Sequence, residues 1–389
     1  MAGQEWLNIA AYSGMFGYGV AMALLGAILP ILSARLRLDL ADAGNLFLAM
    51  NGAMLAATLA LGPLLDRFGA RPALVVAPLL VAASLALIAL APGGYTGLAV
   101  AAMLLGAGGG ALNQSANTLV AGLHRDLSRK SAALNLLGVF YGVGALFIPL
   151  SIGALLDVLG LGRILGCAIV LILVPAVLSA ALRFPPPAGP EDAPSARMSF
   201  LATQPLVIIL ALLLLFQSGN EFILGGFITT RLTRELHASI EQSSYLLAGY
   251  WGAIMIMRVI LSRILLKVSG HALVTASGLG VAAFAAALIL APSLAVAGAA
   301  VIGVGASISA VFPTTLALAG SRYPRNSGTV FGILIAISLV GGMTMPWIAG
   351  RLSAAHGAGA GLALVVAGAL AISGLQLAVR RQNARPDAR

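Results

Sequence analysis

Side-chain amides gather in one apolar stretch of the sequence, GALNQSANTLV at residues 110–120. A helix would place Asn113 and Asn117 one turn apart on one face, with Gln114 beside them. Amides that face lipid leave hydrogen-bonding groups unpaired, so this face must turn toward another helix or a water-filled cavity. Both readings stay open, because amides commonly join helices, whereas three amides offer more donors and acceptors than one helix contact needs.

The second candidate is an acid inside an apolar segment, Glu221 in FQSGNEFILGGFITTRL at residues 216–232. An unpaired acid at mid-bilayer costs at least ~2.5 kcal/mol, so Glu221 must be protonated, paired or in contact with water. Arg258 is the other charge expected inside an apolar segment. A Glu221–Arg258 ion pair is one hypothesis, and a Glu221 that contacts substrate or carries a proton is the other. Asn220, its neighbour in sequence, joins the candidate set.

Asn135 and Tyr141 extend the candidate binding residues into the segment that follows the amides. Tyr141 lies nearly two turns after Asn135, and its ring could stack against the apolar face of a sugar. The other aromatic candidates for such stacking are Tyr18, Phe216, Tyr245, Tyr250 and Trp251. Each aromatic ring is also suited to packing or to anchoring at a membrane interface.

Residue types that would support an enzyme are missing from these segments. The sequence has one cysteine, Cys167, so neither an intrachain disulfide nor a multi-cysteine metal site can form. GAGGGA at residues 106–111 formally matches a dinucleotide fingerprint, but no strand or soluble βαβ unit surrounds it. We therefore expect no enzyme activity, no metal site and no cofactor.

The elements that position these residues must cross a membrane. A chain that is 60% hydrophobic and 9% charged, with a mean hydropathy of +1.02, cannot build a water-facing surface. Apolar runs of roughly 20 residues predict an all-α polytopic membrane protein with about twelve transmembrane helices. The predicted spans are 10–32, 43–65, 73–91, 96–121, 132–156, 162–183, 204–229, 242–266, 272–291, 295–319, 328–350 and 359–379.

The basic residues indicate a topology rather than nucleic-acid binding, although the net charge is +10. If both termini are cytoplasmic, fifteen Lys and Arg residues fall inside and six outside, with one more within a helix. We therefore predict a multi-pass protein of the cell inner (plasma) membrane with both termini cytoplasmic. Its expected partners are lipid and a small-molecule substrate, with no nucleic acid, and we expect a monomer.

The chain divides into two related halves. FPPPAGPEDAPSARMS at residues 184–199 is proline-rich and polar, which is typical of a linker. We predict six-helix bundles at 1–183 and 204–389, joined by a cytoplasmic linker at 184–203. The spacing G-x4-P-x3-G recurs from Gly144 and from Gly341, and SARL at 33–36 is similar to TTRL at 229–232. The two offsets, 197 and 196, favour a parallel six-helix duplication.

GPLLDRFGARP at residues 62–72 follows the second predicted span. It resembles the cytoplasmic signature of the major facilitator superfamily. The resemblance implies that this segment forms a gate latch between helices. The matching residues are Gly62, Asp66, Arg67, Gly69 and Arg71. Ala70 stands where a basic residue is usual. The corresponding segment of the second half, RILLKVSGH at 263–271, keeps Gly270 but has Lys267 near the position of the aspartate.

A narrower resemblance, to the fucose-permease-like sugar branch of that superfamily, covers LNQSANTLV at 112–120, ALNLLGVFYGVGALFIPLSIG at 133–153 and the segment around Glu221. Matching positions are Leu112, Asn117, Leu134, Asn135, Phe140, Gly144, Ala145 and Pro149. Asn113 stands where the branch has a protonatable glutamate, and the first span has no acid. The usual proton-coupling pair of that branch is therefore missing.

Together these patterns predict a secondary active or facilitative transporter of a small polar solute, most simply a sugar, that works by alternating access. A proton or sodium ion is the expected coupling ion where there is one. The alternative within transport is a major facilitator exporter of drugs or metabolites.

Overall fold

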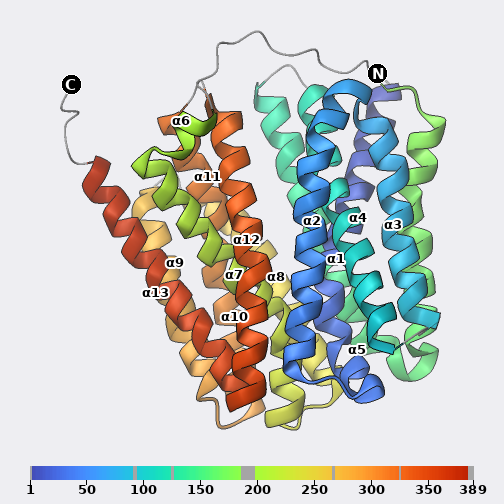
Figure 1. The fold of residues 1–389 in the computed structure, drawn as a ribbon, viewed down its shortest axis with the longest axis vertical. Coiled ribbons are helices and arrows are strands. Elements are labelled where there is room, and N and C mark those ends of the chain that lie inside the picture. The colour runs from blue at the N-terminus through green and yellow to red at the C-terminus, as the bar shows by residue number, and fades with distance from the viewer. Residues whose placement is uncertain are drawn as a thin grey trace. The chain divides into compact units, whose positions relative to one another are not determined.

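The computed structural model describes residues 2–90, 94–123, 127–184, 198–264, 268–323 and 326–383, and this part of the chain is almost entirely helical (Figure 1). The helices are α1 Ala2–Leu36, α2 Leu40–Phe68, α3 Ala70–Leu90, α4 Gly94–Leu123, α5 Leu127–Ala181, α6 Met198–Ala202, α7 Pro205–Glu235, α8 Ile240–Ile264, α9 Gly270–Ile289, α10 Leu294–Ile308, α11 Val311–Arg322, α12 Ser327–His356 and α13 Ala358–Asn383. The short α6 falls within the segment 184–203 that was predicted as a linker.

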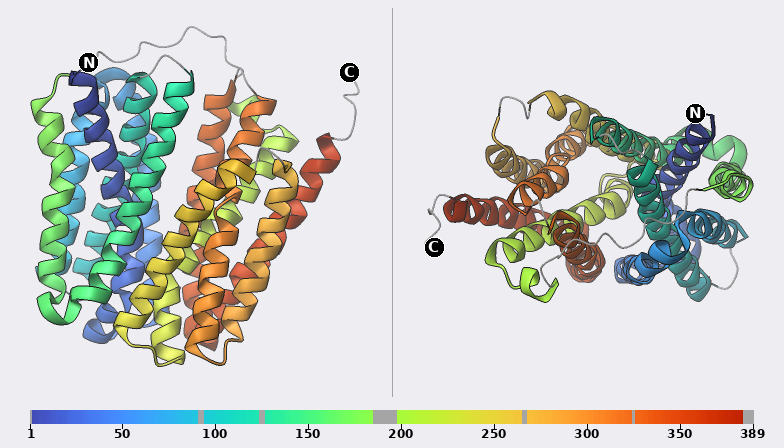
Figure 2. Two further views of the ribbon diagram at one scale, coloured as in Figure 1. Left: turned by 180° about the vertical axis from the view of Figure 1, so that it is seen from behind. Right: turned by 90° about the horizontal axis from the view of Figure 1, so that it is seen from above.

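Eleven helical stretches in the described residues are long and apolar enough to cross a membrane. One of them, in α5, contains Gly160, whose φ of 73° and ψ of 159° interrupt the helix. This left-handed φ favours glycine, and the chain doubles back there in the green part of the ribbon (Figure 2). Counting the two arms of α5, 127–159 and 161–181, gives twelve crossings, which confirms the predicted polytopic all-α fold.

The predicted span 295–319 is interrupted in the structure. α10 ends at Ile308 and α11 begins at Val311, with Ser309 and Ala310 between them. Pro313 has no N–H, so it cannot donate the helical hydrogen bond to the carbonyl of Ser309. The hydroxyl of Ser309 turns back to donate to the carbonyl of Ala306 at 2.8 Å. The carbonyls at the end of α10 are therefore open to partners from other helices.

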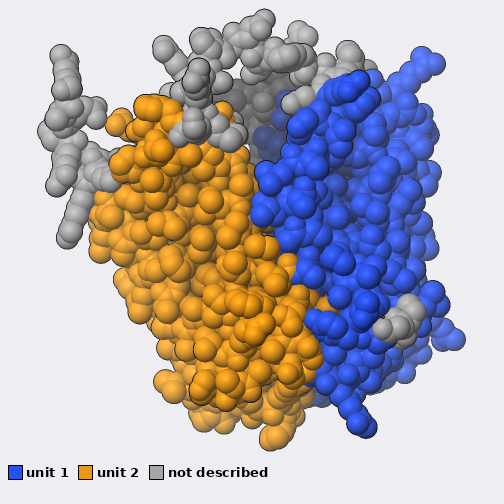
Figure 3. Space-filling model, viewed as in Figure 1, with its two compact units in different colours: residues 1–38, 49–192, 239–248 blue, residues 39–48, 193–238, 249–389 orange. Residues whose placement is uncertain are grey.

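Two compact units make up the chain, as Figure 3 marks by colour. Unit 1 comprises residues 1–38, 49–192 and 239–248, and unit 2 comprises residues 39–48, 193–238 and 249–389. The first turns of α2 thus cluster with unit 2, and the first turns of α8 with unit 1. In unit 1, a Cβ on Gly153 of α5 would lie 2.9 Å from Cε1 of Tyr245, so the beginning of α8 packs directly on α5.

Glycines at matching positions bring helix backbones together in both units. In unit 1, a Cβ on Gly144 of α5 would collide with the carbonyl oxygen of Phe16 in α1. In unit 2, a Cβ on Gly341 of α12 would collide with the carbonyl oxygen of Leu215 in α7. Glycine is needed at both places because any side chain would force the two backbones apart. The glycines are 197 residues apart (341 − 144), the offset that the G-x4-P-x3-G spacing predicts.

A second pair of contacts repeats the pattern between other helices. Gly106 of α4 lies against the carbonyl of Met50 in α2, and Gly305 of α10 lies against the carbonyl of Tyr250 in α8. The offsets are 199 (305 − 106) and 200 (250 − 50). Equivalent helix pairs therefore pack through equivalent glycines, which supports a duplication of six helices.

Candidate functional site

The amide face on α4 is held by a hydrogen bond within the helix. Nδ2 of Asn117 donates to Oδ1 of Asn113 at 2.9 Å and to the carbonyl oxygen of Asn113 at 2.8 Å. Both side chains are half-buried. The bond fixes the orientation of both amides and leaves Nδ2 of Asn113 and Oδ1 of Asn117 for other partners. The face thus presents one donor and one acceptor that are already oriented.

Gln114 points elsewhere, toward α2. A Cβ on Gly62 would lie 3.8 Å from Nε2 of Gln114, so this amide packs beside the first glycine of the superfamily signature. Its Oε1 is buried and has no hydrogen-bond partner among the described residues. Gln114 therefore belongs to the contact between α4 and α2 rather than to the face of Asn113.

Tyr141 is 7% exposed, and its ring packs against that of Tyr18 in α1 in a tilted arrangement. The ring centroids are 5.3 Å apart with planes inclined by 35°. A Cβ on Gly109, one turn before Asn113, would lie 3.5 Å from Cδ2 of Tyr18. Tyr18 thus lies next to both Tyr141 and the amide helix and brings an aromatic surface to that part of unit 1. The side chain of Asn135 lies outside the described residues.

In unit 2, Glu221 is part of a hydrogen-bonded cluster at the interruption of α10. Nε2 of Gln217, one turn earlier on α7, lies 3.4 Å from Oε2 of Glu221 and 3.4 Å from the carbonyl oxygen of Ile308. Gln217 is 1% exposed, whereas Glu221 is half-buried. The amide therefore links the acid to the free end of a broken helix. Gln217 was not among the sequence candidates, although its i, i+4 spacing from Glu221 could have identified it.

α8 supplies the charge and the hydroxyl that face this cluster. Arg258 attracts the Glu221 carboxylate electrostatically. Glu221 also interacts electrostatically with the phenol of Tyr250. Tyr250 is completely buried, and its hydroxyl has no hydrogen-bond partner in the part of the chain that the structure describes. Acid, guanidinium, amide and phenol thus share one polar region between α7, α8 and α10.

Asn220 occupies a different face of α7. It is completely buried, and a Cβ on Gly368 of α13 would lie 2.6 Å from its Oδ1. Neither amide atom has a hydrogen-bond partner within the described ranges. The side chain is therefore packed between α7 and α13, away from the contact that joins Gln217 to α10.

The superfamily signature anchors one helix end to another. Gly69 has a φ of 73°, which permits the turn from α2 into α3. Nε and Nη2 of Arg71 donate to the carbonyls of Ser179 at 3.1 Å and Ala180 at 2.8 Å, at the end of the second arm of α5. These carbonyls lack helical partners, so the arginine caps that end. Arg67 is exposed, and the side chain of Asp66 lies outside the described residues.

The first turns of α2 are fixed to α12 within unit 2. Nε1 of Trp347 donates to Oδ1 of Asn45 at 3.1 Å, and the guanidinium of Arg351 lies 4.4 Å from the centroid of the Trp347 ring. A Cβ on Gly44 would lie 3.1 Å from the carbonyl oxygen of Pro346. Backbone proximity, a hydrogen bond and a cation–π contact thus act at one place.

Groups suited to holding a metal do not occur in the described part of the chain: no three His, Cys, Asp or Glu residues come together there. The polar regions around Asn113 and Glu221 contain hydrogen-bonding groups and one acid, without a convergent nucleophile and base. Their arrangement is suited to reversible binding of a polar molecule.

Comparison with known proteins identifies the family. The family model described as Major Facilitator Superfamily matches residues 11–346, and no curated protein matches the chain. A nucleoside transporter superposes with a TM-score of 0.78 at 13% identity, over 97% of this chain and 99% of that one. A bacterial homologue of the human lysosomal transporter Spinster, inward-facing and occupied, gives 0.76 at 14% identity over 100% of both chains. The Escherichia coli fucose:proton symporter gives 0.67 at 20% identity over 96% of this chain and 98% of that one.

At such identities, the structural matches show the fold alone. The family model covers most of the chain, and the twelve crossings and the signature around Gly69 agree with it. The chain belongs to the major facilitator superfamily and is a multi-span membrane transporter.

Proposed function

We propose that this transporter carries a small, uncharged, polar solute, with a monosaccharide as the favoured class, by alternating access. The observation that carries the proposal is the cluster in which Gln217 joins Glu221 to the free carbonyl of Ile308. Irregular backbone at membrane depth is tolerated where it lines a cavity or binds a partner, and transporter sites use such broken helices.

The chemistry of the cluster is suited to hydroxyl groups. The carboxylate of Glu221 and the carbonyl of Ile308 accept hydrogen bonds, and a sugar hydroxyl can donate to one while accepting from an amide. In unit 1, the oriented amides of Asn113 and Asn117 offer the same combination, and Tyr18 with Tyr141 offers aromatic surface. Each unit by itself thus offers hydrogen-bonding groups suited to hydroxyls, and unit 1 also offers aromatic surface for the apolar face of a sugar ring.

Two of the similar structures support this choice of solute class. The similar structures include a fucose symporter and a nucleoside transporter, and fucose and nucleosides both contain a hydroxylated ring. Glu221 is the residue that we favour to carry a coupling proton, because it is an acid inside the membrane-spanning helix α7, where ionisable groups serve proton and substrate pathways. Sodium is the other coupling ion that we consider. We further propose a monomer in the inner (plasma) membrane with both termini cytoplasmic, as the basic residues indicate.

Uptake into proteoliposomes tests the proposal. Purified protein is given radiolabelled pentoses, hexoses and 6-deoxyhexoses, each with and without an inward pH gradient. We expect uptake of at least one sugar, and we expect Glu221→Gln and Gln217→Ala to reduce it. Asn220→Ala is the matched control, because Asn220 is next to Glu221 in sequence but packs against α13.

Two results would contradict the proposal. If Asn220→Ala removes uptake while Glu221→Gln and Gln217→Ala leave it unchanged, the binding residues lie on another face of α7. If no sugar moves while an apolar drug or metabolite is transported, and that transport depends on Glu221, the protein is an exporter of the alternative class.

A further inference from the structure

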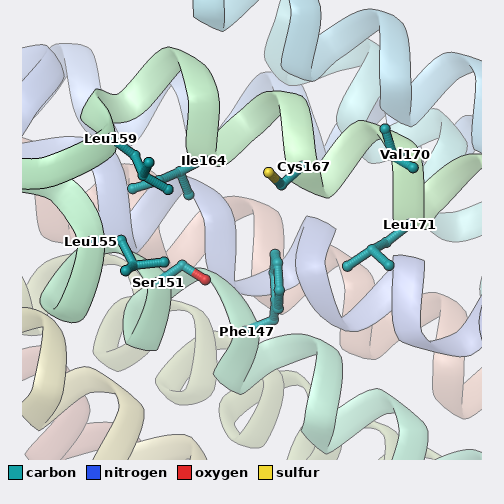
Figure 4. Close-up of a pocket in the computed structure, with 8 residues that line it drawn as sticks. All are labelled: Phe147, Ser151, Leu155, Leu159, Ile164, Cys167, Val170 and Leu171. Carbon is teal, nitrogen blue, oxygen red and sulfur yellow. The ribbon is translucent and has the colours of Figure 1, made fainter.

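An apolar groove runs between the two arms of α5. Phe147 and Leu155 line it on the first arm, and Ile164 and Leu171 line it on the second (Figure 4). Its volume is about 430 Å³, within the range of small-molecule sites. Ser151 is the one lining residue with a side-chain oxygen.

The outer surface around the groove is apolar and open. Val170 on the rim is 69% exposed, and Val158 before the turn is 74% exposed. Gly162 and Gly166 on the second arm have open space where a Cβ would be. Both arms lie in a membrane-spanning segment, so this surface meets hydrocarbon rather than water. Water binds weakly in such a groove because it finds almost no hydrogen-bond partners there. A flexible acyl chain, in contrast, can fill it.

Two charges stand at the turned end of the groove. Asp157 and Arg163 flank the turn that joins the arms, and both are exposed. Neither takes part in a hydrogen bond or ion pair with another residue in the described ranges. Asp157 is two residues before Leu159, and Arg163 directly precedes Ile164, and both of these neighbours line the groove. An acid and a base therefore lie at the place where an acyl chain in the groove would meet its headgroup.

We propose that this groove is a binding site for one bilayer phospholipid whose headgroup carries both a phosphate and a primary ammonium, as phosphatidylethanolamine does. Arg163 binds the phosphate, Asp157 accepts from the ammonium, and an acyl chain lies between the arms. The site is separate from the solute cluster of unit 2 and does not depend on the substrate proposed above.

The single cysteine makes occupancy measurable without engineering a probe. Cys167 lines the groove and is exposed, so a bound acyl chain shields its thiol. The experiment measures the rate at which N-ethylmaleimide alkylates Cys167 of the full-length protein in detergent micelles, by mass spectrometry. Phosphatidylethanolamine, phosphatidylcholine or phosphatidylglycerol is added at increasing mole fraction. Phosphatidylcholine has no N–H donor, and phosphatidylglycerol has no ammonium.

We expect phosphatidylethanolamine to halve the alkylation rate at a roughly tenfold lower mole fraction than phosphatidylcholine. Tenfold corresponds to ~1.4 kcal/mol, close to the value of one hydrogen bond to a charged group. Asp157→Asn should remove this preference, and Arg163→Gln should weaken protection by all three lipids. Cys167→Ser with Val177→Cys is the matched control, because Val177 is exposed on the same arm outside the groove. Its thiol should show no headgroup preference.

The proposal is overturned if the three lipids protect Cys167 equally, if Asp157→Asn keeps the preference of the wild type, or if the thiol at position 177 shows the same preference. The first two results would mean that no headgroup is recognised at the turn. The third would mean that the lipid changes the micelle rather than filling the groove.

Discussion

Two glycines of α12 should respond to the same substitution with opposite sign. Gly341→Ala places a methyl group against the carbonyl of Leu215, well inside the 3.4 Å at which an ordinary contact begins. Gly332→Ala places it in space with no atom within 4 Å. The first change must separate α12 from α7, whereas the second only removes backbone freedom from the unfolded chain. We therefore expect Gly341→Ala to destabilise the protein and Gly332→Ala to stabilise it.

The magnitudes follow from the two environments. Overpacking costs about 1–3 kcal/mol, and a collision of backbone with backbone belongs at the upper end, since neither side can rotate away. Alanine recovers about 0.5–1 kcal/mol of helix stability relative to glycine. The expected loss for Gly341→Ala is thus about 2 kcal/mol in the free energy of unfolding. For Gly332→Ala, where only the second effect applies, the expected gain is about 0.5–1 kcal/mol.

The assay is reversible unfolding by sodium dodecyl sulfate in mixed micelles, followed by circular dichroism. α5 provides an independent copy of the experiment, because Gly144 meets the carbonyl of Phe16 while Gly138 has no atom within 4 Å. The same signs should appear there. A Gly341→Ala variant as stable as the wild type would contradict this prediction, as would a change of stability in the same direction at the crowded and the open glycines.

Three further predictions concern charged residues. Glu221→Gln should abolish sugar accumulation driven by a pH gradient but retain exchange of labelled for unlabelled sugar, and an unchanged response to the gradient would contradict proton transfer at this acid. Glu235→Ala should lower the free energy of unfolding by about 1.5–3 kcal/mol, because Glu235 pairs with the buried Arg231 and accepts from the N–H of Ala358 at the start of α13. Glu235→Gln keeps an acceptor and should therefore lower the free energy of unfolding by less than Glu235→Ala does. Equal decreases for the two variants would assign the effect to packing. Arg71→Gln should cost about 1 kcal/mol in the same unfolding assay, through the lost bonds to the end of α5, and no change would mean that water replaces the cap.

The fold was largely predictable because bilayer thickness fixes the length of each apolar run. The turn at Gly160 falls between the predicted spans 132–156 and 162–183. The interruption after Ile308 was not predicted, since single serines such as Ser309 are common in membrane helices and the apolar run resumes at Ala310. Pro313 was the available signal, but a proline inside a membrane helix often bends it without ending it. The contacts of Gly106 and Gly341 depend on which helices are neighbours. The residue pattern of a single helix does not contain that information.

For the candidate site, the sequence predicted the types of residue involved better than it predicted which side chains contact one another. The prediction that Glu221 lies within a span is borne out by its place in α7. The spacing of Asn113 and Asn117 placed them one turn apart, and their mutual hydrogen bond follows from that spacing. Whether they bind a solute stays a prediction. Asn220 and Gln114 were grouped with their sequence neighbours, but a helix turns about 100° per residue, so adjacent positions face different helices.

The hydrogen bond between Asn45 and Trp347 also has a consequence for biosynthesis. The two residues are 302 positions apart, so at about 5–20 residues per second Asn45 enters the membrane roughly 15–60 s before its partner is made. The beginning of α8 has no such delay, because its contact Gly153 has already been made when Tyr245 is added to the chain. During that interval, a nascent chain exposes the amide of Asn45 and the bare backbone at Gly44. A membrane insertase or chaperone that shields this short segment would therefore act on the beginning of α2 while the ribosome is still translating the second half.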